Sequence, residues 1–349
     1  MGLTSTSPVR VARWLPLAGI VLASAACGTS PASPSVQTST TSVTTAYEYS
    51  VTGGSGDVIK STTPGYVLMG GGTDVDEAMR WLIARSGGGD VLVLRATGTN
   101  AYNPYLFGLG GANSAATLIL KARSAASDAF VLDKVAKAEA LFIAGGDQSD
   151  YVTMWKDTPL EDAIRAAAIR GVPIGGTSAG QAVLGQYVYA ALGASAESTT
   201  VLADPYHASV TLERGFLDLP GLDGVITDSH FVTRDRLGRL VTFLARLAQD
   251  GWTADARGIG VDERTAILVD GSGRATVAGT GAAYFLRNIG RPELCQSGRA
   301  LQLNDVQVYR ASGASTFDLR SWSGVGGSAY AVSAARGGLL SSQLGGSVY

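Results

Sequence analysis

Residues 174–183, IGGTSAGQAV, place a serine where it could act as a nucleophile. The stretch GTSAG around Ser178 fits the pattern G-x-S-x-G, in which a nucleophilic serine occupies a strained turn between a strand and a helix. The residues are small because the chain reverses so tightly that larger side chains would collide. The apolar VPI before the turn and the helical stretch after it supply the required context. The motif therefore favours a nucleophile over the alternative, a structural glycine-rich loop.

A serine hydroxyl needs a base, and the base needs an acid that orients it. The chain has two histidines, His207 and His230. His230 follows the apolar run GVIT, so it would emerge at the end of a strand, whereas His207 lies in a proline-containing loop. Position therefore favours His230 as the base.

The orienting carboxylate stays open on residue chemistry alone. Asp228 stands two residues before His230 and would share its face in an extended segment. Glu263 and Asp262 follow the apolar run GIGV, and Glu197 is a further candidate. Each could equally be an ordinary surface carboxylate or a loop cap.

The order of these residues argues against the common α/β-hydrolase arrangement. That arrangement runs serine, acid, histidine, usually with the histidine near the end of the domain. Here a long stretch of chain follows His230. The same serine turn must therefore belong to another architecture.

Apolar runs alternate with helical patterns along the chain, beginning with GYVLMGGG at 65–72. Strands that are apolar on both faces predict a mostly parallel α/β sheet covered by helices. Glycine-rich turns at 70–72, 145–148 and 175–180 each follow a predicted strand, so we expect them to meet at the carboxyl edge of the sheet. Short antiparallel strands follow, with DGSG at 270–273 as a hairpin turn.

Composition bounds the class of protein. The chain has 349 residues, 46% hydrophobic and 16% charged, which suffices for a real core. A formal net charge of −2 gives no basic excess, so we expect no nucleic-acid partner. The two cysteines, Cys27 and Cys295, make no disulfide framework and no zinc-like spacing. We therefore expect no metal and no other cofactor.

The first 27 residues are typical of an export signal. Arg10 and Arg13 precede the apolar run WLPLAGIVLASAAC, which is too short to span a membrane. Cys27 could carry a lipid as the first residue of a mature lipoprotein, although Ser24 stands where such sites usually carry leucine. We expect an exported protein that is either anchored through a lipid on Cys27 or secreted.

Three further segments follow the signal. Residues 28–55 are rich in Ser, Thr and Pro, as expected of a tether. Residues 56–310 form the predicted catalytic domain, and residues 311–349 are predicted to be a Gly/Ser-rich C-terminal tail. The sequence leaves open whether the chain forms a homodimer.

Four linked motifs resemble the S51 serine peptidases, the family of aspartyl dipeptidase and cyanophycinase. They are GGDQ, GGTSAG, DSHFVTRDRLGRL and GIGVDERTAI, in the family's order over roughly residues 65–310. The likeness is greatest to the cyanophycinase branch, and NDVQVYR at 304–310 is also similar to secreted cyanophycinase-like proteins. The resemblance implies a class I glutamine amidotransferase-like, flavodoxin-like fold with a short antiparallel C-terminal extension.

The resemblance also implies roles for individual residues. Ser178 would be the nucleophile, His230 the general base and Glu263 the orienting acid. The backbone N–H groups of Gly146 and Ala179 would form the oxyanion hole. The residues that match a substrate pocket are Gln148, Asp228, Arg234, Arg236 and Arg239.

The implied activity is exopeptidase cleavage of cyanophycin, a poly-aspartate chain carrying arginines on its β-carboxyl groups, to β-Asp-Arg dipeptides. Arginines suit free carboxylates because the guanidinium fork binds them bidentately, and Asp228 could pair with a substrate cation. Ser229 stands where characterised cyanophycinases have a glutamine, and Asp235 stands where the family often has a glycine. Both positions lie in the substrate region. Two alternatives therefore stand: an α- or β-aspartyl dipeptidase with the same triad, and a non-catalytic binding lipoprotein on the same fold.

Overall fold

The computed structural model describes residues 38–43, 45–54 and 56–349. The expected export signal, with Cys27, lies outside the described residues, as does much of the expected tether. Within the described part of the chain, no helix is both long and apolar enough to cross a membrane.

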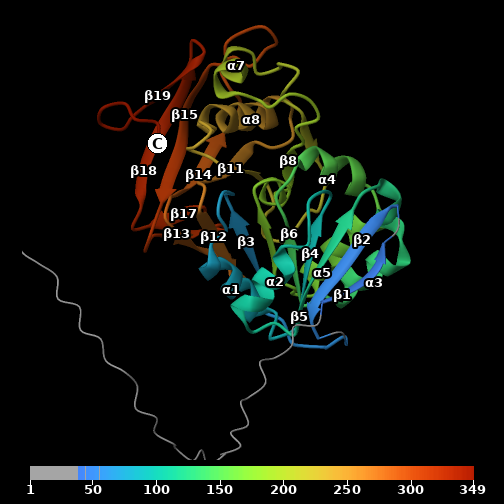
Figure 1. The fold of residues 1–349 in the computed structure, drawn as a ribbon. Coiled ribbons are helices and arrows are strands. Elements are labelled where there is room, and N and C mark those ends of the chain that lie inside the picture. Colours follow the sequence, from blue (N-terminus) through green and yellow to red (C-terminus); the bar gives the residue numbers. More distant parts are fainter. Residues whose placement is uncertain (1–37, 44, 55) are drawn as a thin grey trace, which may run out of the picture. The chain divides into compact units, whose positions relative to one another are not determined.

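The centre of the first sheet is parallel, as the alternation of strands and helices predicted (Figure 1). Its strands are apolar and buried on both faces, which requires helices on either side. In spatial order they are β5 (Ser114–Leu120), β4 (Asp90–Arg95), β6 (Ala140–Ile143), β7 (Ile174–Thr177) and β3 (Gly65–Met69).

Antiparallel strands extend this sheet on both sides. On the β5 side lie β2 (Tyr47–Gly53) and β1 (Thr38–Val43). On the β3 side lie β12 (Thr265–Asp270), β13 (Arg274–Gly279), β16 (Thr316–Asp318) and β17 (Ser323–Val325). The predicted hairpin turn at 270–273 is confirmed, because it joins β12 to β13 and the Gly273 N–H donates to the Asp270 carbonyl at 2.9 Å.

The second sheet is mixed and contains eight strands among the described residues. Only β8, β10 and β11 are parallel neighbours there. The order is β19 (Gly338–Ser341), β18 (Ser328–Ala335), β15 (Leu303–Ala311), β14 (Ala283–Ile289), β11 (Asp255–Val261), β10 (Val225–Asp228), β8 (Tyr187–Tyr189) and β9 (Leu212–Arg214).

The prediction of a mostly parallel sheet is therefore only partly right. The antiparallel part is far larger than a short extension, since short turns join many of the later strands and a short turn cannot join parallel neighbours. The segment 311–349, expected to be a tail, forms β16 to β19 and enters both sheets. At the other end, β1 and β2 fall within the segment expected to be a tether.

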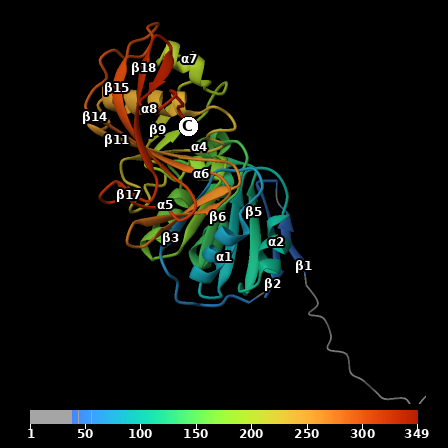
Figure 2. The same ribbon diagram turned by 90° about the vertical axis from the view of Figure 1, so that its left-hand side faces the viewer.

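Helices cover the two faces of the parallel centre (Figure 2). On one face, Met79 and Leu82 of the first helix pack with Val91 and Val93 of β4. The alternate β4 residues point to the opposite face, as the period of two in a strand requires. The helices of the first face are α1 (Asp76–Arg85) and α2 (Tyr102–Leu109); those of the opposite face are α3 (Ala129–Lys137) and α5 (Pro159–Ile169).

The remaining helices lie nearer the turns that follow the strands. They are the 3₁₀ helix η1 (Arg123–Ser127), α4 (Gln148–Trp155), α6 (Ala179–Ala182), α7 (Ser198–Ala203) and α8 (Leu237–Gln249). The apolar face of α8 packs on the second sheet through Leu240, Leu244 and Leu247, which lie in one buried cluster with Ile226. This packing fixes the start of α8 beside the carboxyl end of β10.

Candidate active site

Ser178 occupies a tight turn between β7 and α6, as the motif predicted. Its backbone has φ 52° and ψ −117°, a strained conformation for a residue with a side chain. Two residues on, a Cβ added to Gly180 would lie 2.0 Å from the Ile143 carbonyl oxygen, so only glycine fits there. The sharp turn holds the Ser178 hydroxyl at the carboxyl edge of the parallel strands.

His230 supplies the partner of that hydroxyl. Ser178 Oγ lies 2.7 Å from His230 Nε2. The histidine follows β10, and its backbone N–H donates to the Gly70 carbonyl at 2.7 Å. Its ring lies over Gly71, where an added Cβ would approach the imidazole Cε1 to 2.5 Å. The glycine turn after β3 thus makes room for the imidazole beside Ser178.

Glu263 completes the chain of hydrogen bonds, because its Oε1 lies 2.6 Å from His230 Nδ1. With Nδ1–H donating to the carboxylate, Nε2 is left to accept from the Ser178 hydroxyl, and we assign this tautomer from the two contacts. The Arg264 N–H donates to the Gly71 carbonyl at 2.8 Å, which ties the loop after β11 to the same glycine turn.

The other sequence candidates lie elsewhere. Asp262 accepts from the backbone N–H groups of Val232 and Ala282, at 3.2 and 3.0 Å. Glu197 immediately precedes α7. His207 contacts Ser209, with Nδ1 2.9 Å from the hydroxyl oxygen. The structure therefore brings together Ser178, His230 and Glu263, and not the alternatives.

The environment of His230 lowers its pKa below the ordinary value of 6.5. Burial is the main cause, since it disfavours the charged imidazolium. The hydrogen bond to Glu263 acts in the opposite direction, while the positive charges of Arg234 and Arg236 lower the pKa further. His230 is therefore neutral at pH 7 and able to accept a proton.

The loop after β6 runs alongside Ser178 and contains Gly146. At its neighbour Gly145, the position of an added Cβ lies 3.4 Å from Ser178 Cβ. The buried Tyr151 holds this loop by donating its hydroxyl to the Ala144 carbonyl at 2.8 Å. Sequence reasoning missed Tyr151, although an aromatic residue one helical turn after GGDQ was a usable signal. This loop and Ala179 therefore border the serine.

A hollow of about 230 Å³ adjoins this loop. Gly146 and Tyr189 line it, together with most of the residues expected to contact substrate. The Gln148 amide donates to the Tyr189 carbonyl at 3.2 Å, which fixes one wall. The predicted substrate residues that line the hollow are Gln148, Arg234, Arg236 and Arg239.

Arg234 and Arg236 differ in how their charges are held. Arg234 is exposed, and no ion pair holds its guanidinium within the described residues. The guanidinium of Arg236 donates to the backbone carbonyl of Ser229 at 2.8 Å. Its Nη1 also lies 3.4 Å from Asp228 Oδ1. Burial lowers the pKa of Arg236 to about 10, against the opposing effect of Asp228, so the group stays charged at neutral pH.

The expectation that Asp228 pairs with a substrate cation needs correction. Asp228 is 2% exposed, and both of its carboxylate oxygens accept from Arg239, at 2.7 and 2.5 Å. Arg236 is a second cation beside it. With its acceptors occupied by two arginines, Asp228 orients the guanidinium groups of the hollow instead of facing a ligand.

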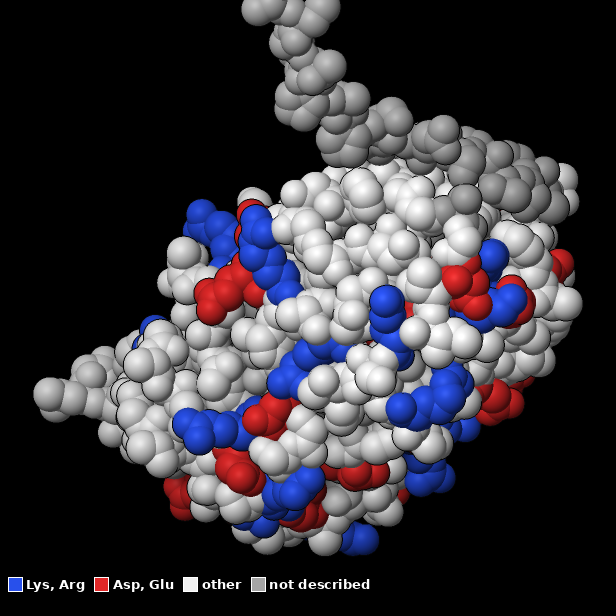
Figure 3. Space-filling model, turned by 90° about the horizontal axis from the view of Figure 1, so that it is seen from below, with Lys and Arg blue, Asp and Glu red and all other residues white. Residues whose placement is uncertain are grey.

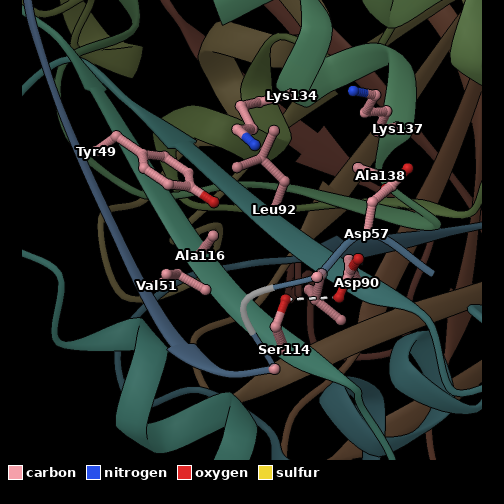
Figure 4. A pocket seen from close by; sticks show the side chains of 13 residues that line it. Tyr49, Val51, Asp57, Asp90, Leu92, Ser114, Ala116, Lys134, Lys137 and Ala138 are labelled. Carbon is pink, nitrogen blue, oxygen red and sulfur yellow. Dashed lines mark hydrogen bonds between the residues drawn. The ribbon is translucent and has the colours of Figure 1, made fainter. Parts of the chain in front are cut away.

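Other surface features lie away from Ser178. A small hollow of about 60 Å³ lies near Asp90 and Ser114, and a hydrogen bond of 2.6 Å joins these two side chains. Figure 4 shows the side chains that line it. Asp90 begins β4, whereas Ser178 follows the end of the parallel strand β7, so this hollow lies at the opposite end of the sheet. Figure 3 shows acidic and basic side chains interspersed on one face of the protein. Among the described residues, no His, Cys, Asp and Glu cluster could hold a metal ion.

Known proteins match a large part of this chain. A cyanophycinase from Geminocystis herdmanii is 34% identical over 182 residues, which are 52% of this chain and 61% of that protein. A cyanophycinase from Synechococcus elongatus is 32% identical over 170 residues, which are 48% of each protein. The match thus spans only about half to three fifths of these relatives.

A solved structure is similar at lower identity. The crystal structure of a peptidase from an acI-B1 Actinobacterium covers 66% of this chain and 96% of its own, with 18% identity and a TM-score of 0.47. The model of peptidase family S51 matches residues 114–277, the segment that contains Ser178, His230 and Glu263. The chain thus contains a segment that matches peptidase family S51 and is similar to cyanophycinases.

Proposed function

We propose that this protein is a serine exopeptidase of the cyanophycinase type, which hydrolyses cyanophycin to β-Asp-Arg dipeptides. The observation that carries the proposal is the chain of two hydrogen bonds from Ser178 through His230 to Glu263, at 2.7 and 2.6 Å. A hydroxyl, a neutral imidazole and a carboxylate in this order can generate a nucleophile at neutral pH.

Acylation begins with proton transfer from Ser178 Oγ to His230 Nε2 as the oxygen attacks the scissile carbonyl. Glu263 stabilises the imidazolium that forms and keeps Nδ1 protonated. The negative charge that develops on the carbonyl oxygen receives hydrogen bonds from the N–H groups of Ala179 and Gly146. His230 then returns the proton to the leaving amine, and an acyl-enzyme ester remains on Ser178.

Deacylation repeats these steps with water as the nucleophile. His230 accepts a proton from the water as it attacks the ester carbonyl, and it then gives that proton back to Ser178 Oγ. The products are a free carboxylic acid and the regenerated serine hydroxyl.

Charge in the hollow supports a substrate that carries carboxylates. The guanidinium of Arg234 is exposed and forms no ion pair with any residue that the structure describes, and Arg236 lines the same hollow. A guanidinium binds a carboxylate through two parallel hydrogen bonds, which fixes the substrate as well as attracting it. Arg239 is held from behind by Asp228, so it serves as part of a rigid wall.

A second candidate, an α- or β-aspartyl dipeptidase, keeps the same triad and the same arginines. It is favoured by Ser229 and Asp235, which depart from the cyanophycinase pattern within the substrate loop. The carboxylate of Asp235 accepts a hydrogen bond from Tyr349, so the departure belongs to a specific contact of this chain.

The test incubates the protein with insoluble cyanophycin and assays the soluble fraction for β-Asp-Arg by mass spectrometry. Ser178→Ala removes the nucleophile, and Ser272→Ala, on the β12–β13 turn, is the matched control. Release by wild type and Ser272→Ala but not by Ser178→Ala is the expected result. Release from aspartyl dipeptides alone would select the second candidate. No release from either substrate, with no labelling of Ser178 by a fluorophosphonate, would favour a binding protein.

We also propose that the chain is exported and carries a lipid on Cys27. Arg10, Arg13 and the apolar run up to Cys27 support this proposal. Metabolic labelling with palmitate and membrane fractionation test it. Wild type should label and sediment with membranes, and Cys27→Ser should lose both properties. If the protein were found in the culture medium without the palmitate label, it would instead be secreted.

A further inference from the structure

Tyr349 contacts the loop that carries the substrate arginines, although more than a hundred residues separate them in the sequence. Its hydroxyl donates to the Asp235 carboxylate at 2.8 Å and accepts from the Leu237 N–H at 3.0 Å. Its ring meets Phe231 edge to face, with the ring centres 6.0 Å apart, and Tyr284 at 5.9 Å. One side chain thus touches the loop at three points.

The loop between His230 and α8 has few other restraints on its outer side. Its residues 232–235 are exposed, and Asp235 has a φ of 46°, a left-handed conformation that few residues other than glycine adopt. The residue before α8, Arg236, makes no side-chain cap to the helix. The hydroxyl of Tyr349 takes that place, because it accepts from the first N–H of α8.

Ser198 holds the same loop from the inner side. Its hydroxyl donates to the backbone carbonyl of Asp235 and accepts from the backbone N–H of Arg239 at 3.1 Å. The backbone of Asp235 is therefore held by Ser198 and its side chain by Tyr349. The two flanking arginines, Arg234 and Arg236, take their directions from this fixed residue.

The strap, residues 328–349, brings Tyr349 to this position. It begins as β18 and β19 in the second sheet, where β18 pairs with β15. Its last turn is tied back to β18 because the Tyr330 hydroxyl donates to the Val348 carbonyl at 2.9 Å. The chain beside Tyr349 is thus held to β18 of the second sheet as well as to the loop that Tyr349 contacts.

We propose that Tyr349 is a positioning residue that orders the loop 231–237, so that Arg234 and Arg236 meet the carboxylates of the substrate. The proposal rests on the proposed function for the identity of that ligand. It gives Asp235 a role, because glycine at this position would offer no acceptor to the tyrosine hydroxyl. Asp235 and the strap together determine how the two arginines are presented to the substrate.

The test uses Tyr349→Phe, which removes only the hydroxyl. The control is Tyr206→Phe, which removes another tyrosine–aspartate bond, 2.6 Å to Asp250 at the opposite end of α8. Hydrogen exchange measured by mass spectrometry over residues 231–240 reports loop order without any substrate. Steady-state kinetics on the cleaved aspartyl peptide reports substrate binding.

We expect Tyr349→Phe to speed exchange of the Leu237 amide and to raise KM, each by roughly fivefold, the effect of one lost hydrogen bond. The value of kcat should stay within about twofold, because the Ser178–His230 contact is unaltered. Tyr206→Phe should change neither quantity. In an Asp235→Gly background, Tyr349→Phe should have a smaller effect on KM, which is the signature of coupled residues.

Unchanged exchange in Tyr349→Phe would overturn the proposal, as would a fall in kcat with KM unaltered. If wild type cleaves no aspartyl peptide, the proposed function fails on its own. Hydrogen exchange over residues 231–240 still tests the positioning role in that case. Faster exchange in Tyr349→Phe alone supports the role, and equal exchange in Tyr349→Phe and Tyr206→Phe refutes it.

Discussion

Asp228 and Arg239 form a buried ion pair in which the carboxylate accepts two hydrogen bonds from one guanidinium, at 2.7 and 2.5 Å. Both side chains are almost fully buried, at 3% and 2% exposure. Burial of two charges is tolerated because each neutralises the other and their hydrogen bonds are satisfied. The pair joins the end of β10 to α8 and supports the wall of the arginine-lined hollow.

Asp228→Ala should destabilise the protein by about 3–5 kcal/mol, because it leaves the Arg239 charge buried without a partner. Asp250→Ala, which breaks a more exposed pair with Arg246 on α8 and a hydrogen bond from Tyr206, should cost only about 1–2 kcal/mol. Urea unfolding of the two variants measures the difference. Equal unfolding midpoints would show that the Asp228 pair makes no special contribution to stability.

Ser178→Gly should be more stable than Ser178→Ala by roughly 1 kcal/mol or more. Both variants lose the hydroxyl, but only glycine relieves the strain of a backbone at φ 52° and ψ −117°. Thermal unfolding compares the two, and neither should turn over substrate. A less stable glycine variant would mean that the turn stores no strain.

The local part of the site could be predicted from the sequence. The turn at Ser178 depends on residues that are adjacent in the chain, so the strand, the glycines and the helix could be identified together. The meeting of the three glycine turns followed from the rule that parallel strands end at the same edge. Gly145 lies against Ser178, and the Ser178 backbone N–H donates to the carbonyl of Met69, just before Gly70, at 3.0 Å, so both contacts bear out that expectation.

The parts that depend on distant residues could not be predicted. Asp228 was expected to share a face with His230, but the backbone turns to φ 50° at His230, so the alternation of a strand fails there. Asp228 instead faces Arg239, and His230 faces Ser178. The segment 311–349 also gave little signal, because its small residues become strands only through pairing with β13 and β15.

Activity should fall at acid pH as His230 becomes protonated, with a midpoint below 6.5. Protonated His230 cannot accept the Ser178 proton, so kcat/KM is full above the His230 pKa and lost below it. Burial is the main cause of the lowered pKa, and the nearby Arg234 charge adds to it. Arg234→Gln removes that charge and should move the acid limb of the kcat/KM profile to higher pH.

Arg246→Gln, at the far end of α8, is the control for this shift because its partner is Asp250 and not the triad. Its acid limb should coincide with that of wild type. A limb that stays in place in Arg234→Gln, or moves to lower pH, would contradict the assignment of His230 as the titrating base.

Glu263→Gln should lower kcat by about 10²–10⁴-fold while leaving KM nearly unchanged. The amide has nearly the shape of the carboxylate but can donate to Nδ1, which would favour the tautomer that carries its proton on Nε2 and cannot accept from Ser178. It also carries no charge to stabilise the imidazolium. Glu213→Gln, which removes the partner of Lys156, is a matched control and should retain full kcat. If Glu263→Gln retained wild-type kcat, the carboxylate would only fill space beside His230, and the base would have to be oriented by its backbone contacts with Gly70 alone.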